Sequence, residues 1–222
     1  FCSWIFSNNS SNSDKLLPPT SSFYLLLTFK ESRILRNMKS VFARSLFKSY
    51  DGINAVDGID LDVDEGQIFG FLGPNGAGKS TVIKLLTTLI QPTSGKISVL
   101  EIDVAKEPLN IRKKIGVVLQ QPSYEPTLTV EKSLEKYGMM WDLDKKTRMN
   151  RTEELLIAFN LVEIRKKRNE DLSIGQRRRV QVAREFMHDM DLLFLDEPTV
   201  GLDPTARRQL LDFLKNKVKE KN

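Results

Sequence analysis

Residues that form covalent or metal-bound cross-links are scarce in this sequence, and long apolar runs are absent. Its 222 residues include one cysteine, Cys2, and one histidine, His188. A single cysteine excludes an internal disulfide and a Cys-based zinc cluster. The longest apolar candidate, residues 23–29, is far shorter than the about 20 residues that cross a bilayer as a helix. The sequence therefore predicts one substantial hydrophobic core without a disulfide framework or a membrane span.

The positive charge of the chain is confined to its first part. The formal net charge is +5, and residues 1–48 carry all of that excess, so basic and acidic residues are equal in number in the remainder. A protein that binds nucleic acid usually gathers Lys and Arg into a basic patch on its folded domain. The balanced body therefore argues against nucleic acid as a partner.

The segment before residue 38 has the composition of a leader. Residues 7–13 contain only Ser and Asn, and a Pro-Pro pair follows within residues 16–22. Such segments bury too little apolar surface to fold. Residues 1–37 are therefore predicted to be a disordered or non-native leader, with Met38 as a natural start and a genuine basic amphipathic leader as the alternative. We expect a chain that starts at Met38 to be as stable as the whole.

Hydrophobic periodicity predicts an α/β arrangement after residue 38. Alternating apolar positions favour strands, and apolar positions three or four residues apart favour helices. Residues 124–188 are expected to form a mostly helical subdomain, in which Met139, Met140 and Trp141 are expected to pack in the core rather than to form a docking surface. The other expected elements are strands over 39–50, 67–72, 93–100, 115–119 and 192–195 and helices over 79–90 and 204–219.

A glycine-rich segment lies between a predicted strand and a predicted helix. Gly73-Pro-Asn-Gly-Ala-Gly-Lys-Ser80 fits the pattern of a phosphate-binding loop, in which backbone N–H groups and a helix N-terminus surround phosphate oxygens. Lys79 is expected to reach the β- and γ-phosphates and Ser80 to ligate Mg²⁺. A chance Gly-rich turn is the alternative. The expected nucleotide-binding residues here are Gly73, Pro74, Asn75, Gly76, Ala77, Gly78, Lys79, Ser80 and Thr81.

Two carboxylates follow the apolar run Leu192–Leu195. Asp196 and Glu197 stand where a strand buried on both faces is expected to end. Asp196 is the expected Mg²⁺ partner, and Glu197 is expected to polarise the water that attacks the γ-phosphate. Alone, such a pair is more typical of a solvated turn or a helix cap. Together with the phosphate-binding loop it predicts the second half of a nucleotide-hydrolysing site.

Leu172-Ser-Ile-Gly-Gln-Arg-Arg-Arg179, shortly before Asp196-Glu-Pro-Thr199, resembles the signature motif of ABC ATPases. The resemblance covers residues 39–222 and implies an α/β P-loop NTPase core of the ABC ATPase type, with a β-rich front subdomain and a helical subdomain. In that family two nucleotide-binding domains sandwich ATP head to tail. Ser173, Gly175 and Gln176 would then contact the nucleotide held by the opposite subunit. Ile174 stands where the family has a glycine.

Other positions of the family are carried over one at a time. Tyr50 resembles the aromatic residue that stacks on adenine, although an aromatic in a strand is ordinarily part of a core. Gln120 resembles the Q-loop glutamine that contacts Mg²⁺, with Gln121 as the alternative. Asp203 resembles the D-loop aspartate that reaches across the dimer, and it is also a good helix start before a proline. His188 is expected to be an ordinary residue near a helix end.

The family also has a switch histidine on a strand after the helix expected at 204–219. The printed sequence supplies no counterpart, because its only histidine, His188, precedes Asp196. The C-terminal part of the domain is therefore expected to be missing. We expect an exposed sheet edge beside Leu192–Leu195 and slow turnover.

The resemblance implies an ATP-binding subunit of an ABC transporter that hydrolyses ATP in a dimer and works with ATP and Mg²⁺. Its partners would be a second nucleotide-binding domain, identical or different, and an integral membrane permease that holds it at the cytoplasmic face. Residues 68–79, 90–95 and 201–204 look most like exporters of drugs and other hydrophobic compounds. The alternatives are a regulatory module that binds nucleotide without turnover and a soluble ABC ATPase that is not linked to transport.

Overall fold

The computed structural model describes residues 2–6, 23–29, 39–120 and 123–220. The chain divides into two compact units. The strand unit comprises residues 1–117, 190–195 and 215–222, and the helical unit comprises residues 118–189 and 196–214. Each unit is described by itself below.

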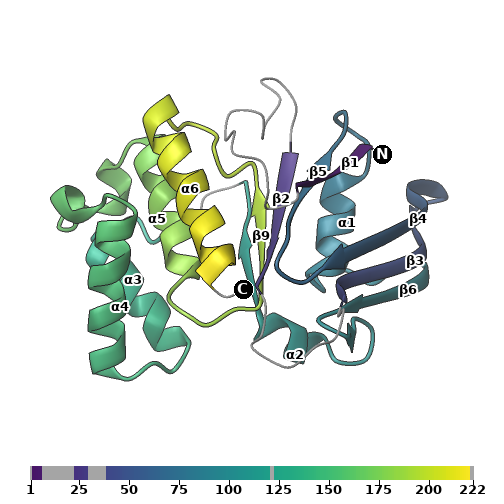
Figure 1. Cartoon of the computed structure of the whole chain (residues 1–222), viewed down its shortest axis with the longest axis horizontal. Coiled ribbons are helices and arrows are strands. Elements are labelled where there is room, and N and C mark those ends of the chain that lie inside the picture. The colour runs from purple at the N-terminus through teal and green to yellow at the C-terminus, as the bar shows by residue number, and fades with distance from the viewer. Residues whose placement is uncertain (1, 7–22, 30–38, 121–122, 221–222) are drawn as a thin grey trace. The chain divides into compact units, whose positions relative to one another are not determined.

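One sheet of the strand unit is antiparallel and has four strands in the order β4-β3-β6-β7 (Figure 1). Asp51 and Gly52 connect β3 to β4 with φ values of 48° and 82°, the left-handed geometry that suits a two-residue hairpin. The strand predicted for residues 39–50 is confirmed as β3. The strands are β3 (Lys39–Tyr50), β4 (Ile53–Asp64), β6 (Ser94–Val99) and β7 (Ile102–Asp103).

The second sheet has five strands in the order β1-β5-β2-β9-β8. Both neighbours of β5, which are β1 and β2, run antiparallel to it. Leu192 to Leu195 of β9 are all buried, as predicted for a strand covered on both faces. The strands are β1 (Cys2–Phe6), β2 (Phe23–Thr28), β5 (Ile68–Leu72), β8 (Ile115–Val118) and β9 (Leu192–Asp196).

Strand β2 corrects two expectations from the sequence. Leu25 and Leu27 are buried, and Phe29 donates its N–H to the carbonyl of Asp191 at 2.9 Å. The prediction of a disordered leader is therefore wrong for residues 2–6, which form β1 beside β5, and for residues 23–29, whose apolar side chains fill a place in the core. The expected open edge beside Leu192–Leu195 is also wrong, because β2 and β8 flank β9. Residues 7–22 and Met38 lie outside the described residues.

Helix α1 (Lys79–Leu86) supplies apolar side chains to the main core of the strand unit. Val82, Ile83, Leu85 and Leu86 are buried with residues of β2, β3, β4, β5, β6 and β9. The short helix α2 (Pro108–Arg112) adds Ile111 to the same cluster. This packing fixes the start of α1, and with it the loop that precedes α1.

The helical unit begins its helices at polar caps. Thr129 accepts a hydrogen bond from Lys132 N, and Asp144 accepts from Lys146 N and Thr147 N. Such caps satisfy N–H groups that a helix leaves unpaired. The elements are α3 (Val130–Met140), α4 (Lys145–Ala158), η2 (Val162–Ile164), η3 (Asn169–Asp171), α5 (Ile174–Glu185) and α6 (Pro204–Glu220), the end of which lies in the strand unit.

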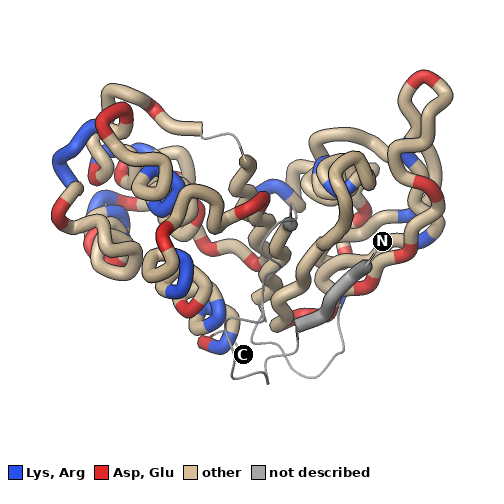
Figure 2. The backbone as a smooth tube through the Cα atoms, turned by 90° about the horizontal axis from the view of Figure 1, so that it is seen from above, with Lys and Arg blue, Asp and Glu red and all other residues tan. Residues whose placement is uncertain are grey.

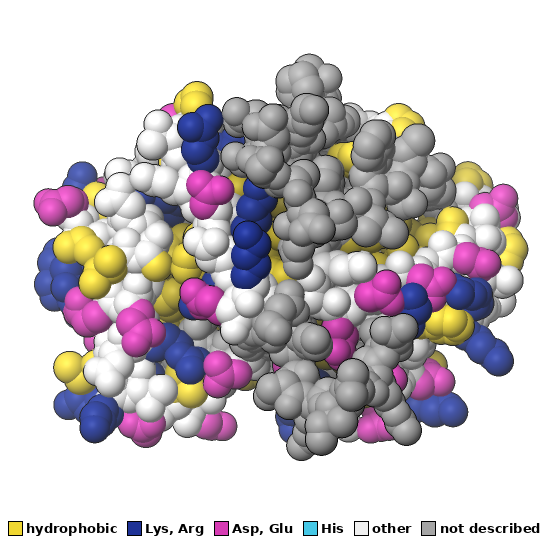
Figure 3. Space-filling view, viewed as in Figure 1, with side chains coloured by type: hydrophobic (Ala, Val, Ile, Leu, Met, Phe, Trp, Pro, Cys, Tyr) yellow, Lys and Arg dark blue, Asp and Glu magenta, His cyan; other side chains and the backbone are white. Residues whose placement is uncertain are grey.

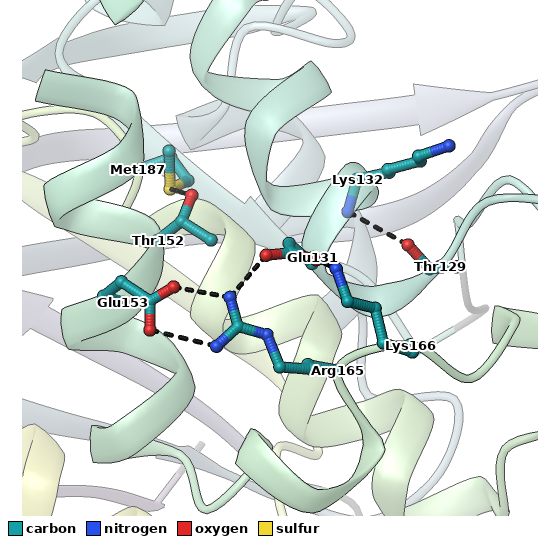
Figure 4. Close-up of polar contacts among 8 residues, drawn as sticks. All are labelled: Thr129, Glu131, Lys132, Thr152, Glu153, Arg165, Lys166 and Met187. Atoms are coloured by element: carbon teal, nitrogen blue, oxygen red, sulfur yellow. Dashed lines mark hydrogen bonds and ion pairs between the residues drawn. The ribbon is translucent and has the colours of Figure 1, made fainter. Parts of the chain in front are cut away.

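An ion-pair network joins α3, α4 and the loop that follows η2 (Figure 4). Arg165 donates to Glu131 and to both carboxylate oxygens of Glu153, and Lys166 donates to Glu131. Glu131 is mostly buried, with a side-chain exposure of 16%. The network therefore ties three segments of the helical unit together.

The expected packing of Met139 and Met140 is wrong. They are 55% and 68% exposed at the end of α3. Trp141, which follows them, stacks on the buried His188 with ring centroids 3.9 Å apart.

Basic and acidic residues are interspersed along the tube of each unit (Figure 2). On the face drawn in Figure 3, the described Lys and Arg side chains lie among Asp and Glu side chains. This mixture agrees with the balanced charge of the sequence after residue 48. Within the described ranges, no helix is both long enough and apolar enough to cross a bilayer.

Candidate functional site

The phosphate-binding loop predicted from the sequence connects β5 to α1, as expected. Gly76 and Gly78 have φ values of 82° and 80°, a left-handed conformation that is unfavourable for residues other than glycine. At Gly78 an added Cβ would lie 2.2 Å from the carbonyl oxygen of Ala55, whereas at Gly76 it would meet nothing within 4 Å. Gly78 is therefore required both by its conformation and by its close approach to β4.

Lys79 is turned inward over the loop. Its side chain is 5% exposed, and its Nζ donates to the carbonyls of Gly73 at 2.6 Å and Pro74 at 2.8 Å. Helix α1 starts here without a side-chain cap and without an acidic residue in its first turn. Its free N–H groups and positive dipole end, together with the Lys79 ammonium, fit an anionic group such as a phosphate.

Ser80, the expected Mg²⁺ ligand, makes a contact that the sequence did not predict. Its hydroxyl oxygen lies 2.5 Å from the phenolic oxygen of Tyr24 on β2. Tyr24 is buried, and Ser80 is exposed. The sequence offered one signal, a tyrosine within the apolar run 23–29, but nothing in the run indicates its partner.

Tyr50 lies at the end of β3 and is 44% exposed, so the alternative that it is a core residue is wrong. Lys48 Nζ lies 5.1 Å from the centroid of its ring. Tyr50 pairs with Ile53 in the hairpin whose second strand carries Ala55, the residue that Gly78 approaches. Tyr50 therefore belongs to the hairpin that the phosphate-binding loop approaches, and its side chain is partly exposed to solvent.

Gln120 and Glu197 meet in the helical unit. Gln120 Nε2 donates to Glu197 Oε2 at 3.2 Å. Glu197 has a φ of 46°, which is unusual for a residue with a side chain and which occurs at functional sites. Both residues line a cavity of about 240 Å³. Asp196 precedes Glu197 at the end of β9, and Gln121, the alternative to Gln120, lies outside the described residues.

The signature segment begins helix α5. The Ser173 side chain accepts from Gln176 N at 3.2 Å, and Gln176 Oε1 accepts from Ser173 N at 3.0 Å. This is a capping box, in which the two residues satisfy each other's N–H groups. Ile174 is 66% exposed. Ser173 and Gln176 thus have a local structural role besides the contact expected from the resemblance.

Gly175 and Gly201 interlock the signature segment with the residues before α6. A Cβ at Gly175 would lie 2.6 Å from the carbonyl oxygen of Gly201, and a Cβ at Gly201 would lie 2.7 Å from Cγ2 of Ile174. Ile174 therefore uses the space that Gly201 leaves by lacking a side chain. This explains how an isoleucine is accommodated where the family has a glycine.

Asp203 caps α6, as its position before Pro204 predicted. Its Oδ1 accepts from Ala206 N at 2.9 Å and Thr205 N at 3.0 Å. The hydrogen bond from Ala206 is the main cause that holds the pKa of Asp203 below its usual range. His188 follows the end of α5, as expected for an ordinary residue near a helix end.

The expected residues fall into two groups. Tyr50 and the loop from Gly73 to Thr81 belong to the strand unit, and Gln120, Glu197, the signature segment and Asp203 belong to the helical unit. Sequence reasoning missed Tyr24 and Arg178. Arg178 donates to the backbone that precedes both Gln120 and Glu197, and its position in a run of three arginines gave no sign of that contact.

A glycine-rich loop between a strand and a helix, closed by a buried lysine, defines a P-loop nucleotide-binding protein. A protein-family model described as "ABC transporter" matches residues 56–200. The chain belongs to the ABC transporter family, as the signature motif predicted. Its mixed α/β architecture also agrees with the predicted fold class.

Two curated relatives illustrate the similarity. The daunorubicin/doxorubicin resistance ATP-binding protein DrrA of Streptomyces peucetius is 40% identical over 177 residues, which cover 80% of this chain and 54% of DrrA. The linearmycin resistance ATP-binding protein LnrL of Bacillus subtilis (strain 168) is 38% identical over 173 residues, which cover 78% of this chain and 56% of LnrL. The chain therefore spans about half the length of the curated relatives it matches.

Solved structures show the same fold. One is the dimeric, post-hydrolysis state of the ATP-binding cassette MJ0796 bound to ADP and Pi, with a TM-score of 0.70 and 27% identity over 81% of this chain and 83% of that one. Another is cbiO1 from Clostridium perfringens, part of the ABC transporter complex cbiONQ, with a TM-score of 0.71 and 27% identity over 82% and 74% of the two chains.

Proposed function

We propose that this chain binds Mg-ATP and hydrolyses it as the ATP-binding subunit of a transporter that exports drug-like or other hydrophobic compounds. The observation that carries the proposal is the phosphate-binding loop, with Gly78 packed on Ala55 and Lys79 buried over the loop carbonyls. In this arrangement Lys79 exchanges its two carbonyl partners for phosphate oxygens when nucleotide enters. Tyr50 stacks on the adenine.

The hydrolytic step is assigned to the pair in the helical unit. Glu197 accepts a proton from the attacking water, and Gln120, which donates to Glu197 at 3.2 Å, orients that carboxylate. Ser80, Asp196 and Gln120 are the residues proposed to hold Mg²⁺. When bound, Mg²⁺ would neutralise charge on the β- and γ-phosphates.

The residue types proposed as ligands offer oxygen atoms, which are the donors that Mg²⁺ prefers. Within the described residues, no group of three or more His, Cys, Asp or Glu could hold a metal ion. Mg²⁺ is usually held by one or two carboxylates together with substrate phosphates and waters. One hydroxyl, one carboxylate and one amide oxygen match that pattern.

The assembly is part of the same proposal. We propose that two nucleotide-binding domains associate head to tail, so that Ser173, Gly175 and Gln176 of one contact the γ-phosphate held by the other, and Asp203 reaches across the interface. The dimeric structure of MJ0796 supports association into a dimer. We also propose a separate membrane permease, which would hold the chain at the cytoplasmic face; the match to the family model described as "ABC transporter" supports a partner in transport.

Two variants of the chain separate binding from hydrolysis. We expect Glu197→Gln to bind Mg-ATP as well as the parent while its turnover falls at least about 100-fold, because the shape is kept and the proton acceptor is lost. Lys79→Ala should instead lose ATP binding. Nucleotide affinity is measured by fluorescence of a labelled ATP, and turnover is measured by release of inorganic phosphate.

The same measurements distinguish the alternatives. A parent chain that binds ATP but releases no phosphate in a single turnover would favour a regulatory module over an enzyme. Hydrolysis by Glu197→Gln at the parent rate would show that another group accepts the proton. Unchanged affinity in Lys79→Ala would contradict the assignment of the loop.

A further inference from the structure

Arg178 is the buried member of a run of three arginines in α5. It is 6% exposed, whereas Arg177 and Arg179 are partly exposed. Arg178 shares a helix face with Gln181 and Glu185, three and seven residues further on, and both are buried. Burial of a guanidinium is costly unless hydrogen bonds and nearby opposite charges compensate. Hydrogen bonds and nearby carboxylates must therefore compensate for the burial of Arg178.

The guanidinium of Arg178 joins two backbone segments of the helical unit. One amino group donates to the carbonyl of Leu119 at 2.7 Å, and the other donates to the carbonyl of Asp196. Gln181 supports this arrangement, because its Oε1 accepts from Arg178 at 2.8 Å and its Nε2 donates to Leu119 O at 3.2 Å. The Leu119 carbonyl thus has two donors from α5.

The two carbonyls that Arg178 holds belong to the residues just before Gln120 and Glu197. Those two side chains are the ones that meet at 3.2 Å. All four residues and Arg178 belong to the helical unit. Arg178 links the backbone carbonyls of the residues that precede Gln120 and Glu197. This link fixes the positions of the two Cα atoms, and therefore how the two side chains meet.

We propose that Arg178 is a positioning residue for ATP hydrolysis: it sets the relation between the Gln120 amide and the Glu197 carboxylate by clamping the backbone before each. The proposal rests on the proposed function for its kinetic consequence, and on the contacts above for its geometry. The planar fork of arginine is suited to two acceptors at once, whereas the single ammonium of lysine is not pre-organised for both. Asp196 and Glu197 also attract the guanidinium and offset part of the cost of burying it.

The test compares three variants of the full chain. Arg178→Met removes the clamp, Arg178→Lys keeps the charge but not the fork, and Arg151→Met is the matched control. Arg151, on α4, donates to the carbonyl of Met187 at 2.8 Å, so it is an arginine with a backbone partner in the same unit and without a contact to the proposed site.

We expect Arg178→Met to lower kcat by about tenfold or more with a KM for Mg-ATP within about threefold of the parent, because positioning acts on the reacting geometry rather than on binding. Arg178→Lys should fall between Arg178→Met and the parent. Arg151→Met should leave kcat and KM at parent values.

Backbone hydrogen exchange gives a readout that is independent of turnover. In the nucleotide-free chain, Arg178→Met and Arg178→Lys should speed exchange in peptides that contain residues 118–120 and 196–199, and Arg151→Met should not. The exchange measurement applies even to a parent chain that hydrolyses no ATP. In that case faster exchange in the Arg178 variants supports the clamp, and only the proposed function fails.

Three results would overturn the proposal. The first is a kcat of Arg178→Met equal to that of the parent. The second is unchanged hydrogen exchange in both peptides of either Arg178 variant, and the third is an equal loss of kcat in Arg178→Met and Arg151→Met. If Arg178→Met does not fold, Arg178→Lys carries the test alone, and either a kcat equal to that of the parent or unchanged exchange in both peptides of that variant would overturn the proposal.

Discussion

The phenolic oxygen of Tyr24 lies 2.5 Å from the hydroxyl oxygen of Ser80. Tyr24 belongs to β2, far from the phosphate-binding loop in the sequence, and Ser80 belongs to the first turn of α1. A hydroxyl oxygen that is hydrogen-bonded to a phenol must break or share that hydrogen bond in order to ligate a cation. The hydrogen bond with Tyr24 therefore competes with the proposed coordination of Mg²⁺ by Ser80.

We predict that Tyr24→Phe binds Mg-ATP more tightly than the parent. Removal of one neutral hydrogen bond of about 1 kcal/mol corresponds to about a fivefold lower Kd. The control is Tyr124→Phe, which removes a tyrosine hydroxyl that accepts from Arg177 at 2.7 Å in the other unit. Weaker binding by Tyr24→Phe would mean that the phenol assists the site instead of competing for Ser80.

Leu27 in β2 should be a determinant of stability. Its side chain is fully buried, so Leu27→Ala is expected to lower the free energy of unfolding by about 2–5 kcal/mol through lost burial and a cavity. Leu89→Ala, at a side chain that is 54% exposed, should change it by less than about 0.5 kcal/mol. Urea unfolding of the two variants measures the difference.

Because β2 is buried, a chain that starts at Met38 is no longer expected to be as stable as the whole chain. Such a chain loses β1 and β2, and β5 and β9 lose neighbours in the sheet. We expect its melting temperature to lie well below that of the whole chain. Equal melting temperatures would indicate that β2 contributes nothing to the fold.

Two glycines of the phosphate-binding loop offer a matched pair. At Gly78→Ala the new methyl group would lie 2.2 Å from the carbonyl of Ala55, whereas at Gly76→Ala it would meet no atom within 4 Å. Both positions have positive φ, so each variant pays a conformational cost of about 1 kcal/mol. Only Gly78→Ala should also lose ATP affinity severely, as measured by fluorescence titration. Equal losses would show that conformation alone governs the loop.

Glu131 should make stability depend on pH. Hydrogen bonds from Lys166 and then from Arg165 hold its pKa below the ordinary value of 4.5. Its carboxylate therefore stabilises the fold above about pH 4.5, and that contribution is lost as the pH falls through the lowered pKa. Glu131→Gln should cost about 1–2 kcal/mol at pH 7 and less at pH 3.

The control for Glu131→Gln is Glu154→Gln, at an exposed position on α4. Its free energy of unfolding should match that of the parent at both pH values. A penalty in Glu131→Gln that is equal at pH 7 and pH 3 would mean that packing, rather than charge, is responsible.

Local patterns predicted most elements of this fold, because burial in a strand or on a helix face leaves a regular trace in the sequence. Strand β9 and helix α6 were found in this way. Strand β2 was not, because its apolar run is short and its partners, β5 and β9, are distant in the chain. No local pattern states which distant strand will accept such a run.

The candidate site was predictable where chemistry fixes the residue type. Lys79, Asp196 and Glu197 follow from the motifs themselves. The bond between Gln120 and Glu197 joins residues 77 positions apart, and the clamp by Arg178 depends on helix phase and on two backbone carbonyls. Backbone acceptors carry no sequence signature, so these relationships needed the structure.

The place of β2 between β5 and β9 has a consequence for how the chain is made. β2 leaves the ribosome before β5 and can pair with it, but β9 begins only at Leu192. One edge of β2 therefore stays open while the residues between β5 and β9 are made, because its second neighbour does not yet exist. Pairing across such a separation is slow, and an open apolar edge attracts other chains. The nascent protein should accordingly depend on chaperones until β9 emerges and closes the sheet.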